Sequence, residues 1–480
     1  MQLRNRERDA EPFVTKDGST IREYHHSNAQ SLAEASLDAG GSTQRHYHAR
    51  SEEIYLIVEG GAELEVDGDR REVAAGDAIL TRPAPGTSWR PANTASGSCV
   101  AASRPTRTTT PSSPSLEGVA TTISFARGAP APELIPAAEL ADCAFEVAKR
   151  EGASVFAYGP GGGYGPLREW IAERHGVAVE RVVITVGGLQ GFVFYAAEQL
   201  ARQPGRVLVE GPSYDRPLKV LARDGAEIVA LPMDDEGLEP DALATELDSR
   251  PDAPSFLYTI PTFQNPSGRT LSNDRRVRLV EIAREHSLAI LEDDPYGLVR
   301  FEGETPTSLL ELEGGSLVTH TSSFSKTVAP GVRTGYFVLP ESQAASFEER
   351  AVSTYISPPF LPEAIVWEWI SRGRFEPNLD HVCHELRARR DAMIAALAQG
   401  FPDAASWSNP EGGYFVWLDL DDVDAPALAA RAGEVGVAII PGPGFFPRDS
   451  GLGASSVRLA YSYETPERIA EGIERLAALL

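Results

Sequence analysis

The sequence is poor in cysteine, in long apolar runs and in basic relative to acidic residues, and each shortage excludes a class of protein. The three cysteines, Cys99, Cys143 and Cys383, are too few and too scattered for a disulfide framework or a cysteine-based metal site. No apolar run approaches the roughly 18 residues that a membrane-spanning helix needs. The first residues, MQLRNRERDAEPF, lack the apolar stretch of a secretory signal. We therefore expect a cytoplasmic protein in a reducing environment, without a membrane partner.

The shortage of basic residues bears on binding partners. Lys and Arg number 44 against 69 Asp and Glu, which gives a formal net charge of −25. Non-specific nucleic-acid binding depends on the neutralisation of phosphates by basic residues, so no nucleic-acid partner is expected. Hydrophobic residues make up 42% and charged residues 24% of the 480 residues, an ordinary globular composition. At roughly 100–200 residues per domain, this length indicates two to four domains and suits a protein that acts on small molecules.

A change in composition divides the chain near residue 110. The segment Ser103–Ser115 reads SRPTRTTTPSSPS and contains no bulky apolar residue. Such a segment cannot bury enough surface to offset the entropy of ordering it. We predict a linker over residues 103–117, between an N-terminal domain of residues 1–102 and a longer second part.

The N-terminal domain has the pattern of short strands joined by tight turns. Ile54–Val58 is an apolar run, and Ala62, Leu64 and Val66 alternate with polar residues before the turn pair Asp67–Gly68. This pattern predicts an all-β barrel or sandwich.

The second part alternates strands with helices. That alternation predicts an α/β domain over residues 118–345, with a largely parallel, helix-covered sheet. Ligand sites in such sheets lie beyond the carboxyl ends of the strands. A helix is expected over 274–286 with Ser272 as its cap. Long helices and short strands over residues 346–480 predict a small α+β domain. The seven predicted strands are Val182–Val186, Val207–Val209, Ile228–Leu231, Phe256–Ile260, Leu288–Leu291, Leu317–Thr321 and Tyr336–Leu339.

Residues able to bind an aldehyde cofactor follow three of these strands. Lys326, flanked by hydroxyl side chains, can act as a Schiff-base nucleophile. Ser323 and Arg333 together can bind a phosphate. Asp293, at the end of the preceding strand, can pair with a protonated ring nitrogen. Tyr296 and Asn265 can hydrogen-bond a ring oxygen, so these positions together fit one ring-shaped ligand. Taken singly, each could equally be a surface residue, a helix cap or a turn.

With further motifs in the same order, the chain resembles the fold-type I pyridoxal-phosphate aminotransferases of class I/II over about residues 120–480. The resemblance implies a mixed, mostly parallel seven-stranded sheet with helices on both faces, and pyridoxal 5′-phosphate (PLP) as cofactor. It makes Lys326 the residue that joins the cofactor and moves the α-proton, with Asp293 and Tyr296 as the other two catalytic residues. The further motifs are Ile123–Phe125 with Gly128 and Pro130, Ala157–Pro160, Gly165–Arg168, Gly187–Gln190, Gly211–Tyr214 and Val457–Leu459.

The same resemblance assigns the remaining contacts. Arg458 would grip the substrate α-carboxylate as a bidentate pair, with Asn265 and Gly128 also at the substrate. Tyr158 would reach the cofactor of a partner subunit, which implies a homodimer. The family often has Ser–Gln where Gly188 and Leu189 stand, so here backbone amides would bind the phosphate. The full set of expected cofactor contacts is Lys326, Asn265, Asp293, Tyr296, Ser323, Ser325, Arg333, Gly188, Leu189, Tyr214 and Tyr158.

The N-terminal domain resembles the cupins through Gly40, His46, His48, Glu53 and Gly60. In a strand, His-x-His places both imidazoles on one face, since side chains alternate. With Glu53, or Glu52 in its place, they could bind a divalent metal such as Zn, Fe or Mn.

A second cupin motif runs from Gly76–Asp77 through Pro85–Trp89 to Asn93. The family usually has its last metal ligand, a histidine, where Trp89 stands. Three interpretations stay open: a metal held by three protein ligands, a metal-free barrel for a small ligand, and a structural unit that aids assembly.

The combined interpretation is a PLP-dependent aminotransferase that transfers an amino group between an amino acid and a 2-oxo acid. The same fold also supports decarboxylation, elimination or replacement, and oxidation of amino acids, because the cofactor serves all of them. A PLP-binding regulator is a further alternative.

Overall fold

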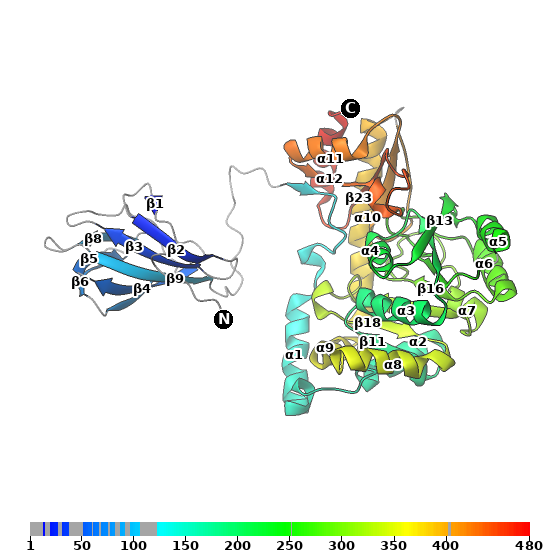
Figure 1. Cartoon of the computed structure of the whole chain (residues 1–480), viewed down its shortest axis with the longest axis horizontal. Coiled ribbons are helices and arrows are strands. Elements are labelled where there is room, and N and C mark those ends of the chain that lie inside the picture. Colours follow the sequence, from blue (N-terminus) through cyan, green and yellow to red (C-terminus); the bar gives the residue numbers. More distant parts are fainter. Residues whose placement is uncertain are drawn as a thin grey trace. The chain divides into compact units, whose positions relative to one another are not determined.

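A computed structural model describes residues 122–250, 252–401 and 405–480, together with Asp77 (Figure 1). It also describes the backbone of strands between residues 13 and 105; within these strands, side chains are described only at Glu72 and Ala74. The chain divides into two compact units, Met1–Val119 and Ala120–Leu480, and each is described separately.

The first unit consists of antiparallel strands in two sheets, ordered β1-β2-β3-β9-β4-β7 and β6-β5-β8. Val66 pairs with Asp69, as the expected hairpin between β5 and β6 requires. The Asp77 carboxylate accepts a hydrogen bond from the Ala74 amide at 2.8 Å. The all-β prediction is confirmed. The strands are β1 Phe13–Val14, β2 Thr20–His26, β3 Ser31–Leu37, β4 Ser51–Glu59, β5 Gly61–Val66, β6 Asp69–Ala74, β7 Ala78–Thr81, β8 Thr87–Pro91 and β9 Gly97–Pro105.

Strand β9 overlaps the start of the segment expected to be a linker. It continues to Pro105 and pairs with β3 and β4, so residues 103–105 belong to the sheet. Residues 106–121 lie outside the described residues. The domain boundaries of 1–102 and 103–117 stay predictions.

The second unit is built on an eight-stranded sheet of order β11-β18-β17-β16-β15-β12-β13-β14. All seven predicted strands are present, and the eighth, β14, is a two-residue strand at the edge. The five strands from β17 to β13 are parallel, β18 is antiparallel to both of its neighbours, and β14 is antiparallel to β13. The strands are β11 Val182–Thr185, β12 Arg206–Gly211, β13 Glu227–Asp234, β14 Gly237–Leu238, β15 Phe256–Thr259, β16 Ile290–Asp293, β17 Val318–Ser323 and β18 Gly335–Val338.

Helices cover both faces of this sheet because its strands are apolar on both sides. Residues such as Leu208 and Ile290 pack with α1, α2, α5, α6, α7 and α9. Their chain neighbours Val209 and Leu291 pack on the other face with α3, α4 and α8. Within the described residues, no helix has the length and apolar character needed to cross a membrane. The helices are α1 Ala137–Glu151, α2 Gly165–His175, α3 Gly188–Arg202, α4 Asp215–Arg223, α5 Pro240–Ser249, α6 Asn273–His286, α7 Leu309–Glu313, α8 Glu341–Tyr355 and α9 Phe360–Ser371.

Helix α6 begins where it was expected, but its cap differs from the prediction. Ser272 occupies the capping position without a side-chain hydrogen bond to the helix. Its hydroxyl instead lies 3.4 Å from a carboxylate oxygen of Glu236. The packing of Leu279, Val280 and Ile282 against the sheet therefore fixes this helix.

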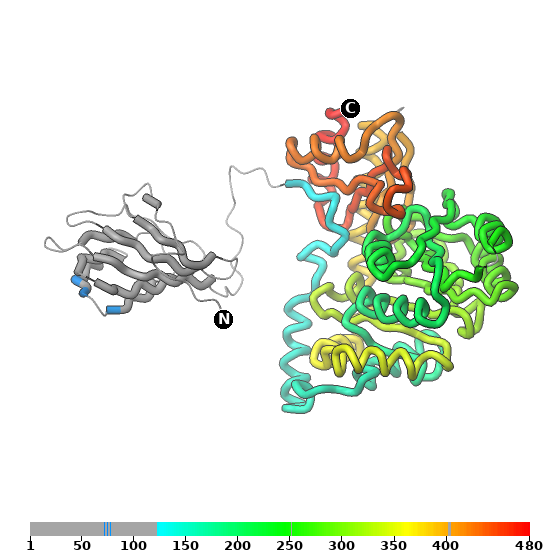
Figure 2. The backbone as a smooth tube through the Cα atoms, in the orientation of Figure 1, coloured from blue at the N-terminus to red at the C-terminus, as the bar shows by residue number. Residues whose placement is uncertain are grey.

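A second core holds the C-terminal part of the chain. Its antiparallel sheet has the order β19-β20-β23-β22 and packs with α10, α11 and α12. The start of the unit joins it, since β10 pairs with β21; Figure 2 shows this cyan segment beside the orange and red end of the chain. The elements are β10 Ile123–Ser124, α10 Phe375–Gly400, β19 Ala405–Trp407, β20 Phe415–Leu420, α11 Ala425–Glu434, β21 Val437–Ala438, β22 Ile440–Pro441, β23 Ser456–Ala460 and α12 Pro466–Ala477.

The two cores divide later in the chain than expected. The boundary proposed between residues 345 and 346 falls inside α8, which packs with the large sheet. Leu379 belongs to the first core and Val382 to the second, so the long helix α10 passes from one to the other.

Candidate active site

One cavity of about 460 Å³ at the carboxyl end of the large sheet collects almost all of the predicted site residues. They come from strand ends, from the start of α3 and from β23 of the small domain. Tyr158 alone among the residues predicted for this site does not line it. The predicted residues that line it are Gly128, Gly188, Leu189, Tyr214, Asn265, Asp293, Tyr296, Ser323, Ser325, Lys326, Arg333 and Arg458.

Lys326 lies in the turn that follows β17 and is enclosed by protein. Its Nζ donates to the Gly128 carbonyl at 2.6 Å and lies 5.1 Å from the centre of the Tyr414 ring. Burial, together with the charges of Arg458 and Arg333, lowers the pKa of this amine to about 8. A sizeable fraction of the amine is therefore neutral, and hence nucleophilic, close to neutral pH.

Asp293 ends β16 and is partly buried, and it has no basic ion-pair partner among the described residues. Burial raises the pKa of its carboxyl to about 7, and a 2.8 Å hydrogen bond from the Tyr258 hydroxyl opposes the rise. A cation beside this carboxylate would stabilise its ionised form. The site therefore fits a ligand with a protonated ring nitrogen at this point.

Tyr258 is a site residue that the sequence pattern did not reveal. It lies in β15, and its ring packs against Phe192 in the core between the sheet and α3. The sequence offered one sign of this role: Tyr258 lies in the predicted strand Phe256–Ile260, which comes before the predicted strand that leads to Asp293. An aromatic residue in an apolar strand is usually simply core, so the pattern alone favoured packing.

Arg458 forms another wall of the cavity. Its Nη1 donates to the Asn265 side-chain oxygen at 3.1 Å and its Nη2 donates to the Ala126 carbonyl at 2.7 Å. The guanidinium lies 4.5 Å from the centre of the Phe415 ring. Its Nε is buried without a hydrogen-bond partner among the described residues. A buried donor without a partner is costly, and a carboxylate would satisfy it.

A buried carboxylate holds the loop that carries Asn265. Glu210, at the end of β12, accepts hydrogen bonds from the Thr259 hydroxyl at 2.6 Å, the Ile260 amide at 3.0 Å and the Gln264 side chain at 3.0 Å. The Gln264 amide group also donates to the Pro212 carbonyl at 2.7 Å. Glu210 and Gln264 thus tie the segment before Tyr214 to the segment before Asn265. The signal missed in the sequence was a charged residue at the end of an otherwise apolar strand.

The start of α3 provides donors for a phosphate. Gly187 precedes the helix with φ of 77°, and Gly188 and Leu189 in the first helical turn line the cavity wall. A Cβ at Gly187 would lie 2.5 Å from Nη2 of Arg333, so glycine is required for this approach. With Ser323 and Ser325 also in the lining, the donor set suits a dianionic phosphate.

Tyr158 lies away from the cavity on this chain. It follows a short 3-10 helix, Gly152–Phe156, and it is 77% exposed. Phe145, Phe156 and Ile356 are also exposed large apolar residues of the same unit.

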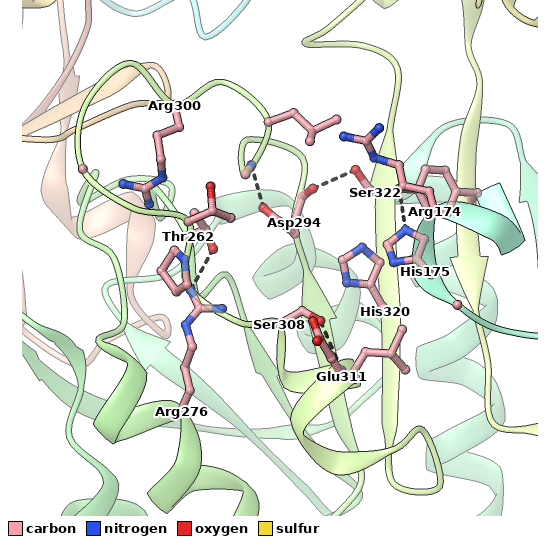
Figure 3. Close-up of a pocket in the computed structure, with 18 of the residues that line it drawn as sticks. Arg174, His175, Thr262, Arg276, Asp294, Arg300, Ser308, Glu311, His320 and Ser322 are labelled. Atoms are coloured by element: carbon pink, nitrogen blue, oxygen red, sulfur yellow. Dashed lines mark hydrogen bonds between the residues drawn. The ribbon is translucent and has the colours of Figure 1, made fainter. Parts of the chain in front are cut away.

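A larger cavity, of about 1130 Å³, contains none of the predicted residues (Figure 3). Its lining includes His320 and Arg276. The two cavities share Ser322, whose hydroxyl donates to the Asp294 carbonyl at 2.7 Å. Figure 3 shows this hydrogen bond. In the same lining, Nε2 of His175 lies 3.1 Å from the Tyr336 hydroxyl.

The predicted metal ligands of the all-β unit are not among the side chains that the structure describes. His46 and His48 lie outside the described residues, as do the side chains of Glu52 and Glu53 in β4. No cluster of His, Cys, Asp or Glu suited to a metal occurs among the side chains that are described. The metal site stays a prediction.

The fold and the cavity define a protein of the PLP-dependent transferase class, and the comparisons agree. A sequence model of the class I and II aminotransferases matches residues 124–476, and the chain belongs to this family. A cupin model matches residues 33–103, within the all-β unit.

Relatives with named activities cover the second unit. An aromatic-amino-acid aminotransferase from Thermococcus litoralis is 33% identical over 365 residues, which are 74% of this chain and 87% of that protein. A 2-aminoadipate transaminase from Thermus thermophilus is 34% identical over 362 residues, 75% of this chain and 90% of that protein. The crystal structure of an α-aminoadipate aminotransferase from Thermus thermophilus superimposes with a TM-score of 0.71 at 34% identity, covering 74% of this chain and 91% of that one.

The lowered pKa of Lys326 gives a first prediction. In protein stripped of cofactor, labelling of Lys326 by an amine-directed acylating reagent should rise with pH and reach half of its plateau near pH 8, because the neutral amine reacts. Peptide mass spectrometry can follow each site separately, since the chain has only four lysines, Lys16, Lys149, Lys219 and Lys326. Exposed Lys149 is the internal control. A midpoint for Lys326 equal to that of Lys149 would contradict the prediction.

Proposed function

We propose that this aminotransferase binds PLP in the 460 Å³ cavity and uses it to move an amino group between an amino acid and a 2-oxo acid. The observation that carries the proposal is the placement of the Lys326 amine and the Asp293 carboxylate on one cavity, both with pKa values shifted by desolvation and with phosphate donors beside them. Bound there, PLP supplies an aldehyde that condenses with amines and a cationic ring that draws electrons from the substrate α-carbon.

Each wall of the cavity has a separate task. Asp293, ionised beside the ring nitrogen, keeps that nitrogen protonated, and Tyr258 helps to keep the carboxylate ionised by donating to it. Lys326 has a pKa close to neutral pH, so its Nζ can accept a proton from the α-carbon and release it again. Tyr296 and Asn265 would bind the ring oxygen of the cofactor, and Tyr214, also in the lining, would pack against its ring.

The substrate carboxylate is assigned to Arg458. Its Nε is without a partner among the described residues, and its Nη1 and Nη2 are fixed by Asn265 and Ala126, so the fork is oriented before the substrate arrives. A carboxylate on Arg458 places the α-carbon between this arginine and Lys326. Gly128, whose carbonyl holds the Lys326 amine, leaves room because it has no side chain.

The direct test is spectroscopic. Purified protein supplied with PLP should be yellow, and borohydride should attach a pyridoxyl group to Lys326 and to no other lysine. Addition of an amino donor without a 2-oxo acid should give pyridoxamine phosphate and a 2-oxo acid. Lys326→Ala should bind PLP reversibly, without the covalent label, and lose about a thousandfold or more in turnover, with the exposed Lys149→Ala as the control.

Two results would overturn the assignment. Wild-type protein that stays colourless after incubation with PLP would exclude the proposed site. Coloured protein that releases carbon dioxide or ammonia in place of pyridoxamine phosphate would indicate decarboxylation or elimination on the same fold.

We further propose a homodimer in which Tyr158 reaches the partner's cavity. It is supported by the exposure of Tyr158, Phe145, Phe156 and Ile356, since large exposed apolar side chains often mark an interface. Light scattering should give twice the chain mass.

Mixed subunits test the role of Tyr158. Tyr158→Ala and Lys326→Ala should each be poorly active alone. Dissociated and reassembled together, about half of the dimers should be mixed, with one of their two sites complete, so activity should recover to about a quarter of wild type. Recovery no greater than the sum of the separate variants would exclude shared sites.

We also propose that the cupin unit binds one divalent metal through His46, His48 and Glu53. The His-x-His pattern lies within the matched residues 33–103 and supports this. Elemental analysis of dialysed protein should find about one Zn, Fe or Mn per chain, lost in His46→Ala and in His48→Ala because each removes a ligand. His25→Ala, outside the motif, should keep the metal. Equal metal contents in all four proteins would refute the site.

A further inference from the structure

The active-site cavity has a cation that the proposed chemistry does not use. Arg216 lies in the first turn of α4 and lines the cavity, and its side chain is 59% exposed. The other cationic residues of the lining are Lys326, Arg333 and Arg458, and each already has a task.

The only ion pair of Arg216 among the described residues is weak. Its Nε lies 3.7 Å from a carboxylate oxygen of Asp215. That same oxygen is held at 2.5 Å by Lys219, one turn further along α4. Asp215 is thus paired with a cation outside the cavity lining, and Arg216 keeps most of its charge for a ligand.

The other charged residues of the cavity lining also leave Arg216 free for a ligand. The anions are Asp215, paired with Lys219, and Asp293, assigned to the ring nitrogen. Arg333 is assigned to the cofactor phosphate and Lys326 to the cofactor aldehyde. Two arginines, Arg458 and Arg216, then remain for the substrate, and its α-carboxylate occupies only one of them.

The two arginines influence each other. The pKa of Arg458 is lowered chiefly by burial; the charge of Arg216 contributes to the lowering, and the charge of Asp215 opposes it. Two like charges on one cavity favour a ligand that carries two negative charges. Apolar side chains of the lining, Phe192, Ile260 and Phe415, suit the methylene groups between those charges.

We infer that Arg216 binds a distal carboxylate and that the enzyme prefers dicarboxylic amino acids, such as glutamate or its one-carbon-longer homologue, over aromatic or aliphatic ones. This inference rests on the proposed function and specifies its substrate class. Arg458 takes the α-carboxylate, and the side chain of the substrate extends along the apolar lining to the first turn of α4.

The experiment compares donors on the PLP-loaded enzyme in single turnovers, without a 2-oxo acid. Glutamate and 2-aminoadipate form one arm, and leucine and phenylalanine the other. Arg216→Gln should lower kcat/KM for the dicarboxylic donors about five- to tenfold, a modest loss because the arginine is half-exposed, and leave the other donors within about twofold. Arg216→Lys should recover part of the loss.

Arg223→Gln is the matched control, because it removes the same charge from the other end of α4, outside the cavity lining. It should leave both arms unchanged. Calorimetry provides a readout apart from turnover: glutarate should bind the holoenzyme more tightly than butyrate, and Arg216→Gln should remove most of that difference.

The outcomes distinguish a failure of the proposed function from a failure of the proposed substrate preference. Wild-type enzyme that reacts with no amino acid, or that does not bind PLP, overturns the proposed function. Wild-type enzyme that transfers amino groups but prefers phenylalanine or leucine overturns the inference alone. Equal losses in both arms for Arg216→Gln also overturn it, since they indicate a structural role.

Discussion

The site depends on the burial of two groups of opposite charge on one cavity without direct pairing between them. Lys326 and Asp293 both lie on the cavity wall with little access to water, and desolvation drives both towards their neutral forms: the pKa of the amine falls to about 8 and that of the carboxyl rises to about 7. Each shift is a cost in the protein alone. A ligand that bonds to the amine and presents a ring cation to the carboxylate relieves both costs. The same desolvation that disfavours the two charged side chains on their own therefore favours one kind of ligand.

The parallel sheet is what keeps the two groups in place. Side chains alternate between the two faces of the sheet, so the position of a residue along its strand decides the face on which its side chain lies. At the edge of this sheet, Glu210 and Gln264 connect the ends of β12 and β15. Their hydrogen bonds satisfy buried polar groups that would otherwise have no partner. The contacts that hold Tyr214 and Asn265 relative to each other are thus distributed over residues that do not line the cavity.

Sequence reasoning succeeded where the physical signal is local. Short runs of β-branched residues predicted the seven longer strands. Motifs at strand ends selected side chains that lie on one cavity, and the roles assigned to those side chains stay predictions. It failed where the outcome depends on distant packing. Tyr258 and Glu210 look like ordinary strand residues until neighbouring strands are aligned, and Ser272 has a capping position that its side chain does not use. The division between the cores inside α10, rather than at residue 345, likewise follows from which helices cover the sheet.

Glu292 and Asp293 show how far neighbours in sequence can differ in role. Burial alone would raise the pKa of Glu292, but His320 at 3.0 Å and the amides of Leu309 and Leu310 bring that pKa below its usual value. Asp293 faces the active site with only a tyrosine hydroxyl, and its pKa is raised. The first carboxylate is satisfied by the protein and contributes to the fold, whereas the second is left for a ligand. Side chains alternate between the two faces of β16, so a shift of one residue in register would exchange the two roles. In the observed pairing of β16 with β17, Glu292 lies opposite His320 and Asp293 opposite Thr321. The proposed chemistry requires this register.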